Sequence, residues 1–415
     1  MKRLNSSGKT AALASLGLFV AWSALADGFR NPPDTAAALG KSGKQIVWAD
    51  DASAIFYNPA NLGDVGARQV QVSALLGYSR AEYRGPLGRT ETTAPWSLLP
   101  AFALAWPLQG TDLTAAFGMH VPYGRQTRWD ADGPFRHAVP VVSKMSVMDF
   151  TPALAWRVSE SVSLGAGLDL YYGRLRFRQL LPFPAPFPEG SIDAEADGFA
   201  TGGNAGISWR LTPQQRLALT VRTPFDLEFS GDLRTEDIPA FLPSAAESDV
   251  ETTFKFPTIV ALGYGVQLAE TVRVEANVEW LQFSRFKNMA IDAGGNAPLA
   301  GALGLANTAQ NWDDTWTFGI GGDWRFASDW TLRAGYLYLQ SPMPDNTFSP
   351  MALDSDQSVV SVGLGYRTGR HAVDLAYAIG IFKTRRIGNN QNPLYRRGEY
   401  DFDGHLAAVT YTYAF

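Results

Sequence analysis

The C-terminal segment alternates regularly between two kinds of side chain. Taken in steps of two from the end, one set is Phe415, Tyr413, Tyr411, Val409 and Ala407, and the other is Ala414, Thr412, Thr410, Ala408 and Leu406. Successive side chains of a β-strand point to opposite faces, so the pattern predicts a strand with one apolar, aromatic face and one smaller, partly polar face. Such a strand, ending the chain on an aromatic residue, is typical of the closing strand of a bacterial outer-membrane barrel.

Similar alternation from Arg68 onward predicts fourteen strands. They cover residues 68–83, 95–107, 112–122, 146–158, 161–177, 199–211, 215–229, 252–268, 271–284, 313–326, 329–339, 357–368, 371–382 and 402–415. A soluble antiparallel sheet would alternate in the same way, and a secreted β-sandwich or propeller is the alternative. The even number of strands, and aromatic residues near strand ends such as Trp316 and Trp324, favour a membrane barrel.

The predicted connections alternate in length. Those after the even-numbered strands are very short: 108–111, 159–160, 212–214, 269–270, 327–328 and 369–370. Those after the odd-numbered strands are long: 84–94, 123–145, 178–198, 230–251, 285–312, 340–356 and 383–401. Short periplasmic turns and long external loops are the rule for these barrels. Every backbone group within a bilayer needs a partner inside the protein, so closure should pair strand 68–83 with strand 402–415.

Residues 1–26 have the pattern of a secretory signal peptide. Basic residues (Lys2, Arg3, Lys9) precede an apolar run from Ala11 to Ala21, and Ala24-Leu25-Ala26 supplies small residues for cleavage. The run is shorter than the ~20 residues that a spanning helix needs, which disfavours a membrane anchor. We therefore expect cleavage after Ala26.

Residues 27–66 lack strand alternation and are rich in Ala, Gly, Asp and Asn. Fourteen strands enclose a wide bore. We therefore expect this segment to form a hatch (plug) inside the lumen, with the transmembrane β-barrel at 67–415. A disordered periplasmic extension is the alternative.

Composition agrees with a membrane barrel. Charged residues make up 18% of the chain, below the ~25% usual in soluble domains, and there are 40 glycines. Cysteine is absent, so closure and burial, rather than disulfides, must hold the fold. The net charge of −5 argues against nucleic acid as a partner.

The segment from Val47 to Ala60 resembles the N-terminal hatch of the FadL-type long-chain fatty acid transporters, a family that includes transporters of toluene and related aromatic hydrocarbons (the FadL/TodX type). The similar residues are Ala49-Asp50-Asp51-Ala52 followed by Asn58-Pro59-Ala60. Gly28-Phe29 resembles the family's mature start, and residues 314–316, 330–336 and 340–342 resemble its tenth and eleventh strands.

The resemblance implies an all-β, 14-stranded antiparallel transmembrane barrel with a hatch in its lumen and no open channel. It implies capture of a ligand among external loops, transfer to a pocket that the mature N-terminus enters, and lateral release through a kink in the third strand. The site residues it implies are Gly28, Phe29, Asn58, Pro59 and Ala60. The predicted third strand, 112–122, has no proline in its middle, so the sequence gives no direct sign of the kink.

Three predicted external loops, 180–188, 238–243 and 297–306, are unusually apolar. Exposed apolar patches mark interaction sites, so these loops are candidates for a groove that receives an apolar ligand. Loops that pack on one another to cap the barrel are the alternative, and both can hold.

Charges predicted to face the lumen are expected to pair with each other or with the hatch rather than to guide a carboxylate. They are Arg273, Glu275, Glu279, Asp323 and Arg325. Asp50 and Asp51 are expected to anchor the hatch to an arginine of the wall.

No catalytic or metal-binding pattern stands out. The four histidines are scattered without metal-ligand spacing, and no Gly-x-Ser-x-Gly motif is present. The Gly-x-Gly pairs at 165–167 and 363–365 lie inside predicted strands, where glycine permits close packing. We expect no enzyme activity, no cofactor and no metal.

We predict passive uptake of hydrophobic compounds across the outer membrane, with long-chain fatty acids as the first ligand and a toluene-like aromatic hydrocarbon as the second. The partners expected are the ligand, outer-membrane lipid and lipopolysaccharide, and the protein is expected to be a monomer. A general diffusion porin or an outer-membrane adhesin is the alternative of another class.

Overall fold

A computed structural model describes residues 27–43, 45–391 and 396–415, so the predicted signal peptide lies outside the described residues. The long strands are β1 (Gln69–Gly85), β3 (Trp96–Pro107), β4 (Leu113–Arg128), β5 (Val142–Arg157), β6 (Val162–Leu181), β7 (Gly190–Thr212), β8 (Gln215–Arg222), β9 (Phe225–Glu236), β10 (Glu247–Phe256), β11 (Ile259–Ala269), β12 (Val272–Leu281), β15 (Thr315–Trp324), β16 (Trp330–Leu339), β17 (Gln357–Thr368), β18 (His371–Phe382) and β20 (Gly398–Ala414). The short elements are β2 (Gly88–Glu91), β13 (Asn288–Asp292), β14 (Asn307–Ala309), β19 (Arg385–Ile387), α1 (Ala36–Leu39), α2 (Ala54–Tyr57), α3 (Ala297–Ala302) and the 3-10 turns η1 (Pro59–Asp64), η2 (Phe283–Arg285) and η3 (Gly294–Asn296).

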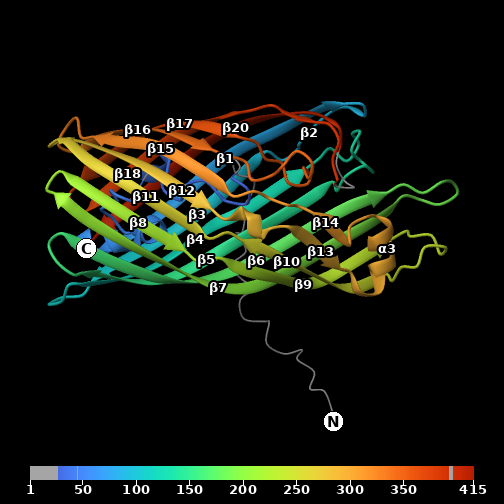
Figure 1. Cartoon of the computed structure of the whole chain (residues 1–415), viewed down its shortest axis with the longest axis horizontal. Helices are drawn as coiled ribbons and strands as arrows, with labels where there is room; N and C mark the ends of the chain where they lie inside the picture. Colours follow the sequence, from blue (N-terminus) through green and yellow to red (C-terminus); the bar gives the residue numbers. More distant parts are fainter. Residues whose placement is uncertain (1–26, 44, 392–395) are drawn as a thin grey trace, which may run out of the picture.

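The long strands form a closed antiparallel barrel (Figure 1). β1 pairs on one side with β3 and on the other with β20, where the register runs from Gln69 opposite Ala414 to Arg84 opposite Glu399. The predicted closure of the first strand on the last is confirmed. The predicted total of fourteen strands is also confirmed when β8 with β9, and β10 with β11, are counted as one wall strand each.

Two predicted strands are each broken in the structure. The predicted strand 215–229 divides into β8 and β9 around Pro224, and 252–268 divides into β10 and β11 around Pro257. Proline has no backbone N–H to donate to a neighbouring strand, so a ladder is interrupted where it occurs. β7 runs past the first break and pairs with both β8 and β9.

Several strands extend further at the loop end than the sequence pattern predicted. β4 reaches Arg128, β6 reaches Leu181, and β9 and β10 fill most of the predicted loop 230–251. In these outer portions the charged side chains are exposed and the apolar ones, such as Phe177, Leu233 and Val250, are buried. The apolar face is therefore the reverse of the one that marks the lipid-facing portions. The short connections gather with the C-terminus at one end of the barrel, and the long ones gather at the other (Figure 1).

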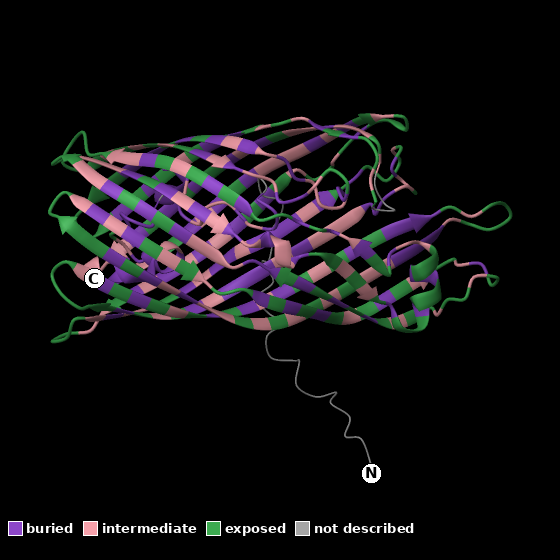
Figure 2. Cartoon of the chain, in the orientation of Figure 1, coloured by how far each residue is buried: buried purple, intermediate pink, exposed green. Residues whose placement is uncertain are grey.

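Exposed and buried residues alternate along the wall strands (Figure 2). On β15, Trp316, Phe318 and Ile320 are about half exposed, whereas Thr315 and Thr317 are buried. An apolar exterior and a polar interior are the arrangement of a barrel that meets lipid on its outer face. No helix among the described residues is long and apolar enough to cross a bilayer.

The N-terminal segment (residues 27–66, with residue 44 not described) packs against the inner faces of many wall strands and is mostly buried. Glycines on the wall make room for it. A Cβ at Gly165 of β6 would lie 2.3 Å from the backbone of Ala60, and one at Gly335 of β16 would lie 2.3 Å from the backbone of Lys41. The glycine pairs within strands therefore permit close packing, as predicted.

Candidate functional site

The first residues of the N-terminal segment lie in a pocket of aromatic rings. Phe29 is 3% exposed, and its ring centroid lies 4.5 Å from that of Trp312 and 5.2 Å from that of Phe286. Gly28 has a φ of +63°, and a Cβ there would lie 2.7 Å from the Phe283 ring, so glycine is the residue that fits. The structure therefore places the predicted site residues Gly28 and Phe29 against aromatic rings inside the barrel.

A cavity of about 60 Å³ opens beside Phe29, and we call it the aromatic cavity. Apolar side chains dominate its wall, and Arg125 of β4 is the single charged residue among the described residues that line it. The Arg125 guanidinium donates hydrogen bonds to the carbonyl oxygens of Gly28 and Leu353. It therefore ties the start of the N-terminal segment to the loop after β16 while it presents positive charge to an apolar space.

The carboxylate of Asp354 completes this attachment. Its Oδ2 accepts a hydrogen bond from the Gly28 N–H at 3.2 Å. Burial raises the pKa of the Asp354 carboxyl above its ordinary value, and the nearby cations Arg125 and Arg385 oppose that shift.

A second apolar cavity, of about 50 Å³, lies toward the external loops, and we call it the loop cavity. Its walls come from β6, β7, β9, β10 and α3, and include Phe177, Leu233 and Leu299. Leu175 lines both the loop cavity and the aromatic cavity. The Leu175 side chain therefore forms part of the wall of both apolar spaces.

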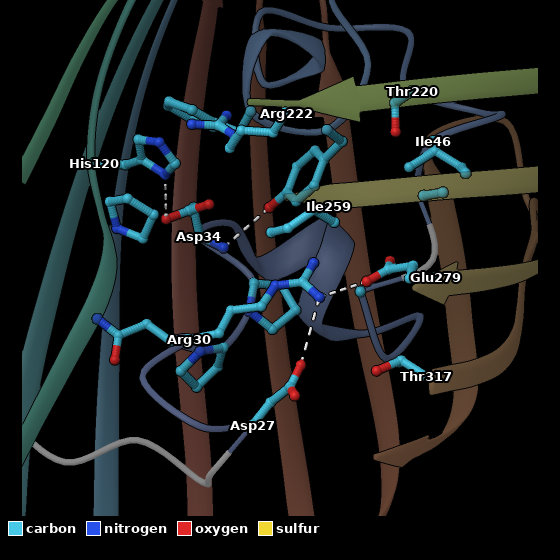
Figure 3. Close-up of a pocket in the computed structure, with 18 of the residues that line it drawn as sticks. Asp27, Arg30, Asp34, Ile46, His120, Thr220, Arg222, Ile259, Glu279 and Thr317 are labelled. Atoms are coloured by element: carbon cyan, nitrogen blue, oxygen red, sulfur yellow. Dashed lines mark hydrogen bonds and ion pairs between the residues drawn. The ribbon is translucent and has the colours of Figure 1, made fainter. Parts of the chain in front are cut away.

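A larger cavity of about 150 Å³, which we call the lumen cavity, lies between the N-terminal segment and the wall (Figure 3). Its lining is mixed. Aliphatic residues such as Ile259 and Leu337 stand beside charged residues from both the segment and the wall.

The charges that line the lumen cavity are paired. Arg30 bonds to Glu279 of β12 and lies 3.6 Å from Asp27, and His120 of β4 lies 3.0 Å from Asp34 (Figure 3). Burial alone would lower the pKa of Arg30, but the two carboxylates outweigh burial and hold the pKa above its ordinary value. No group of three or more potential metal ligands occurs among the residues that the structure describes.

A second set of buried charges stands behind His120. The His120 Nε2 lies 3.2 Å from the carboxylate of Asp149 on β5. Arg222 of β8 bonds to Asp149 at 2.9 Å and to Asp169 of β6 at 3.2 Å. Buried charges cost little only when they are paired in this way. The network links the N-terminal segment, through His120, to three further strands of the wall.

The wall is irregular where β4 passes the N-terminal segment. The pairing between β3 and β4 ends at Phe102 opposite Met119, so residues 96–101 of β3 pair with β1 alone. On the other side of β4, the register with β5 jumps between His120 and Tyr123, which marks a β-bulge. The strand thus bends away from β3 at Pro122, and the earlier prediction of a third strand that ends there, with no proline inside it, is wrong.

The N-terminal segment takes the place that β3 leaves. Asn31 N–H donates to the Pro122 carbonyl at 2.8 Å, Gly124 N–H donates to the Phe29 carbonyl at 2.9 Å, and the Asn31 side chain donates to the Val121 carbonyl at 2.8 Å. Backbone groups of β4 that have no partner on β3 are therefore hydrogen-bonded to the N-terminal segment. The attachment also places Phe29 and Arg30 directly beside the bend.

Asn58, Pro59 and Ala60 lie apart from Gly28 and Phe29. The Asn58 side chain donates to the Ile46 carbonyl at 2.9 Å, and its Oδ1 accepts from the Ala60 N–H at 3.1 Å. Pro59 lines the lumen cavity, and Ala60 packs on Gly165. In this arrangement the Asn58 side chain holds two turns of the segment together, and only Pro59 of the three reaches a cavity.

Replacing Asn58 with Ala is expected to alter uptake more than barrel assembly. The change removes a buried amide whose hydrogen bonds contribute about 1–3 kcal/mol; the shorter ones lie within the segment and the longest, at 3.4 Å, reaches the Ile207 carbonyl of β7. Heat-modified mobility on a gel would report assembly, and ligand uptake by whole cells would report function. Asn307, which is exposed, supplies the matched control change to Ala. Failure of the Asn58 variant to assemble would show a role in folding instead.

The lumen-facing charges pair as the sequence predicted. Arg273 bonds to Asp50 and lies 3.0 Å from Asp323, and Lys41 lies 4.0 Å from Glu275. The predicted anchor of Asp50 to a wall arginine is confirmed. The corresponding prediction for Asp51 is wrong, because Asp51 accepts hydrogen bonds from Ser53 and so stabilises the local turn.

A further pair of ion pairs joins the end of the N-terminal segment to the wall. Asp64 bonds to Arg210 and lies 2.7 Å from Arg216. Arg325 instead donates to the Glu270 carbonyl at a short turn.

The apolar external loops combine both alternatives left open by the sequence. Leu181, Leu299 and Leu305 are buried together, and the last two line the loop cavity. Phe187 and Phe241, in contrast, are exposed and stack edge to face with centroids 5.5 Å apart. Loop packing and an apolar cavity therefore coexist at this end of the barrel.

Sequence reasoning missed the residues that line the cavities most directly. Arg30, Arg125 and Arg222 are single charges without a motif, and His120 was noted only as one of four scattered histidines. Phe254-Lys255-Phe256, like 225–229, alternates apolar with charged residues, but the alternation alone does not say which face is inside. The structure buries the Phe residues of both stretches.

A closed fourteen-stranded barrel with an apolar exterior, an occupied bore and apolar cavities beneath its loops defines an outer-membrane transport protein for hydrophobic compounds. The chain belongs to the outer membrane protein transport protein family (OMPP1/FadL/TodX), whose family model matches residues 17–415.

Individual relatives are distant but extend over the whole chain. A long-chain fatty acid transport protein of Salmonella typhi is 22% identical, and the alignment covers 95% of each chain. The crystal structure of a Pseudomonas aeruginosa FadL homologue superposes with a TM-score of 0.82 at 21% identity, covering 94% of this chain and 100% of that one. The toluene transporter TodX of P. putida superposes with a TM-score of 0.74 at 17% identity, covering 94% and 99%.

Proposed function

We propose that the protein takes up long-chain fatty acids by passive capture and lateral release, with the N-terminal segment acting as a movable hatch. The observation that carries the proposal is the position of Phe29. Its ring forms part of the aromatic cavity, while its own carbonyl is bonded to Gly124 at the bend of β4. A ligand that displaces this ring would therefore act on the contact that fills the gap in the wall.

The cavities supply the successive steps of the proposed route. An alkyl chain would first enter the loop cavity and then pass Leu175 into the aromatic cavity. Apolar walls favour such a ligand at about 25 cal/mol per Å² removed from water. A ligand shifts a conformational equilibrium only by its differential affinity for the two states. The protein must therefore bind the ligand more tightly when the hatch is displaced than when the hatch is in place.

The last step is lateral release between β3 and β4. The missing ladder beyond Met119 leaves the β3 edge without a strand neighbour on that side, and the lumen cavity reaches Pro122 and Tyr123. Movement of Phe29 and Asn31 away from β4 would expose this gap to the membrane.

Arg125 favours an anionic ligand over a hydrocarbon. It is the one charged residue that lines the aromatic cavity among the described residues, and a guanidinium suits a carboxylate. The ring-lined walls formed by Phe254, Phe286 and Trp312 favour the second candidate, a monoaromatic hydrocarbon.

Uptake by cells distinguishes a fatty acid ligand from an aromatic hydrocarbon. Cells that express the protein should take up labelled oleate faster than cells with the empty vector, and toluene less so. Faster uptake of toluene alone would assign the protein to aromatic hydrocarbons, and equal uptake with and without the protein would defeat both assignments. A general porin would instead pass small polar solutes and conduct ions.

Phe29→Ala is expected to weaken oleate binding about tenfold, because the alkyl chain that shifts the Phe29 ring still packs against it, and loss of ~60 Å² of this apolar contact costs about 1.5 kcal/mol. Displacement of a fluorescent fatty acid from purified protein would measure the affinity. Phe318→Ala is the matched control, since Phe318 faces outward and is 48% exposed. Unchanged affinity in the Phe29 variant would remove Phe29 from the binding site.

A further inference from the structure

Two buried hydroxyl groups that line the lumen cavity have no hydrogen-bond partner in the part of the chain that the structure describes. They belong to Tyr123 of β4 and Thr317 of β15, and each of these residues is 1% exposed. The Oδ1 atom of Asn31, on the N-terminal segment, is a third polar atom of this kind at the same cavity. Buried polar atoms are nearly always hydrogen-bonded, so we expect a partner from outside the chain at these three atoms.

Both hydroxyl-bearing residues adjoin the ion pair between Arg30 and Glu279. The backbone of Arg30 forms an antiparallel bridge with Tyr123, and the Arg30 guanidinium bonds to Glu279. Glu279 is directly opposite Thr317 in the ladder between β12 and β15, so their side chains lie on the same face of the wall. Figure 3 shows the Thr317 side chain directed into the space that Arg30 and Asp27 also face. Tyr123 and Thr317 therefore reach one cavity from two separate parts of the wall.

The charges at the lumen cavity disfavour an anionic group there. Three carboxylates and two arginines line it among the described residues: Asp27, Asp34, Glu279, Arg30 and Arg222. Both arginines already pair with carboxylates. A ligand carboxylate would therefore be repelled by like charge, whereas a neutral hydroxyl group would not.

We propose that the lumen cavity recognises a hydroxyl group on the alkyl chain of the transported compound, so that hydroxylated long-chain fatty acids are preferred to unsubstituted ones. This inference rests on the proposed function and names a substrate class for it. A hydroxyl group both donates and accepts, so it can bond to Tyr123 or Thr317 and to the Asn31 oxygen. The carboxylate of the ligand would stay with Arg125 in the aromatic cavity.

The preference follows from what the ligand replaces. An unsubstituted alkyl chain that fills the lumen cavity takes water away from the three polar atoms and returns no hydrogen bond to them. A site with buried polar groups discriminates against a ligand that lacks the matching group, because those groups are then left without partners. A hydroxylated chain restores the hydrogen bonds while its methylene groups contact aliphatic residues of the same wall, such as Ile259 and Leu337.

The test compares oleate with ricinoleate, which is oleate with one hydroxyl group added to its chain. Each acid displaces a fluorescent fatty acid from the full mature protein in detergent, and ricinoleate should bind about tenfold more tightly. The double change Tyr123→Phe and Thr317→Val keeps the shape of both side chains and removes both hydroxyl groups. It should bring the two affinities close to equal and should strengthen the binding of oleate itself, which a loss of structure would not do. Each single change should lower the preference part of the way, so the test does not depend on the double variant alone.

Thr315→Val is the matched control. Thr315 lies on the same strand as Thr317, is 1% exposed and has no partner for its hydroxyl group among the described residues, but it lies outside the lining of the lumen cavity. Its change should leave both affinities as they are. Equal binding of the two acids by the wild-type protein, or an undiminished preference in the double and single variants, would overturn this inference and leave fatty acid uptake standing. Binding of neither acid would overturn the proposed function and this inference with it.

Discussion

Deletion of residues 27–64 is expected to convert the barrel into a conducting pore. The segment packs against strands all around the inner wall, and the wall that it covers is polar, with Gln71, Ser73, Thr410 and Thr412 among its buried residues. A polar bore of fourteen strands fills with water when nothing occupies it. The charged partners left on the wall, such as Arg273 and Asp323, still pair with one another.

Planar-bilayer recording measures this effect. We expect the deletion variant to raise conductance at least about tenfold above that of the full mature protein, which should stay near background. Gly165→Val is a milder companion change, because its side chain would collide with the backbone of Pro59 and Ala60 and should cause intermittent openings. Background conductance in the deletion variant, with the barrel correctly assembled, would show that the segment does not close the bore.

Deletion of Pro122 alone is expected to lower oleate uptake at least about tenfold. Between His120 opposite Asp149 and Tyr123 opposite Val147, β4 has two residues where β5 has one. Removing Pro122 equalises the count, so the residues beyond it keep their register with β5 while the bulge disappears. β4 can then continue its ladder with β3 and close the gap through which release is proposed.

Pro122→Ala is the control for this deletion. It keeps the extra residue and the carbonyl that accepts from Asn31, so uptake should stay near the wild-type rate. Both variants should assemble, which heat-modified mobility would verify. Normal uptake by the assembled deletion variant would exclude release at this bend.

The sequence predicted most of the fold because lipid imposes a strict alternation on the wall. Trp316, Phe318 and Ile320 had to face outward together, and the turns between adjacent strands had to be short at one end. The strand breaks at Pro224 and Pro257 could have been predicted from the sequence, because proline rarely lies inside a central strand. The outer ends of β7, β9 and β10 were not predicted, because their apolar residues (Ile192, Leu233 and Val250) face the loop cavity and their exposed face is charged.

The site was less accessible to sequence reasoning. Gly28 and Phe29 came from a family resemblance, and the structure places Phe29 at the aromatic cavity and Gly28 against the Phe283 ring. Arg30, His120 and Arg125 depend on contacts between residues about 90 or more positions apart, such as Arg125 with Gly28, and no local pattern encodes them. The bend of β4 was missed because Pro122 was taken as the end of the strand rather than its middle.

Photo-crosslinking with a diazirine analogue of oleate tests most directly whether an apolar ligand travels through the interior of the barrel. We expect adducts on residues that line the loop and aromatic cavities, with Leu175, Phe29 and Trp312 foremost, and their loss when unlabelled oleate competes. Adducts confined to lipid-facing residues such as Phe318 and Val362, and insensitive to competition, would show that the ligand does not pass through the interior.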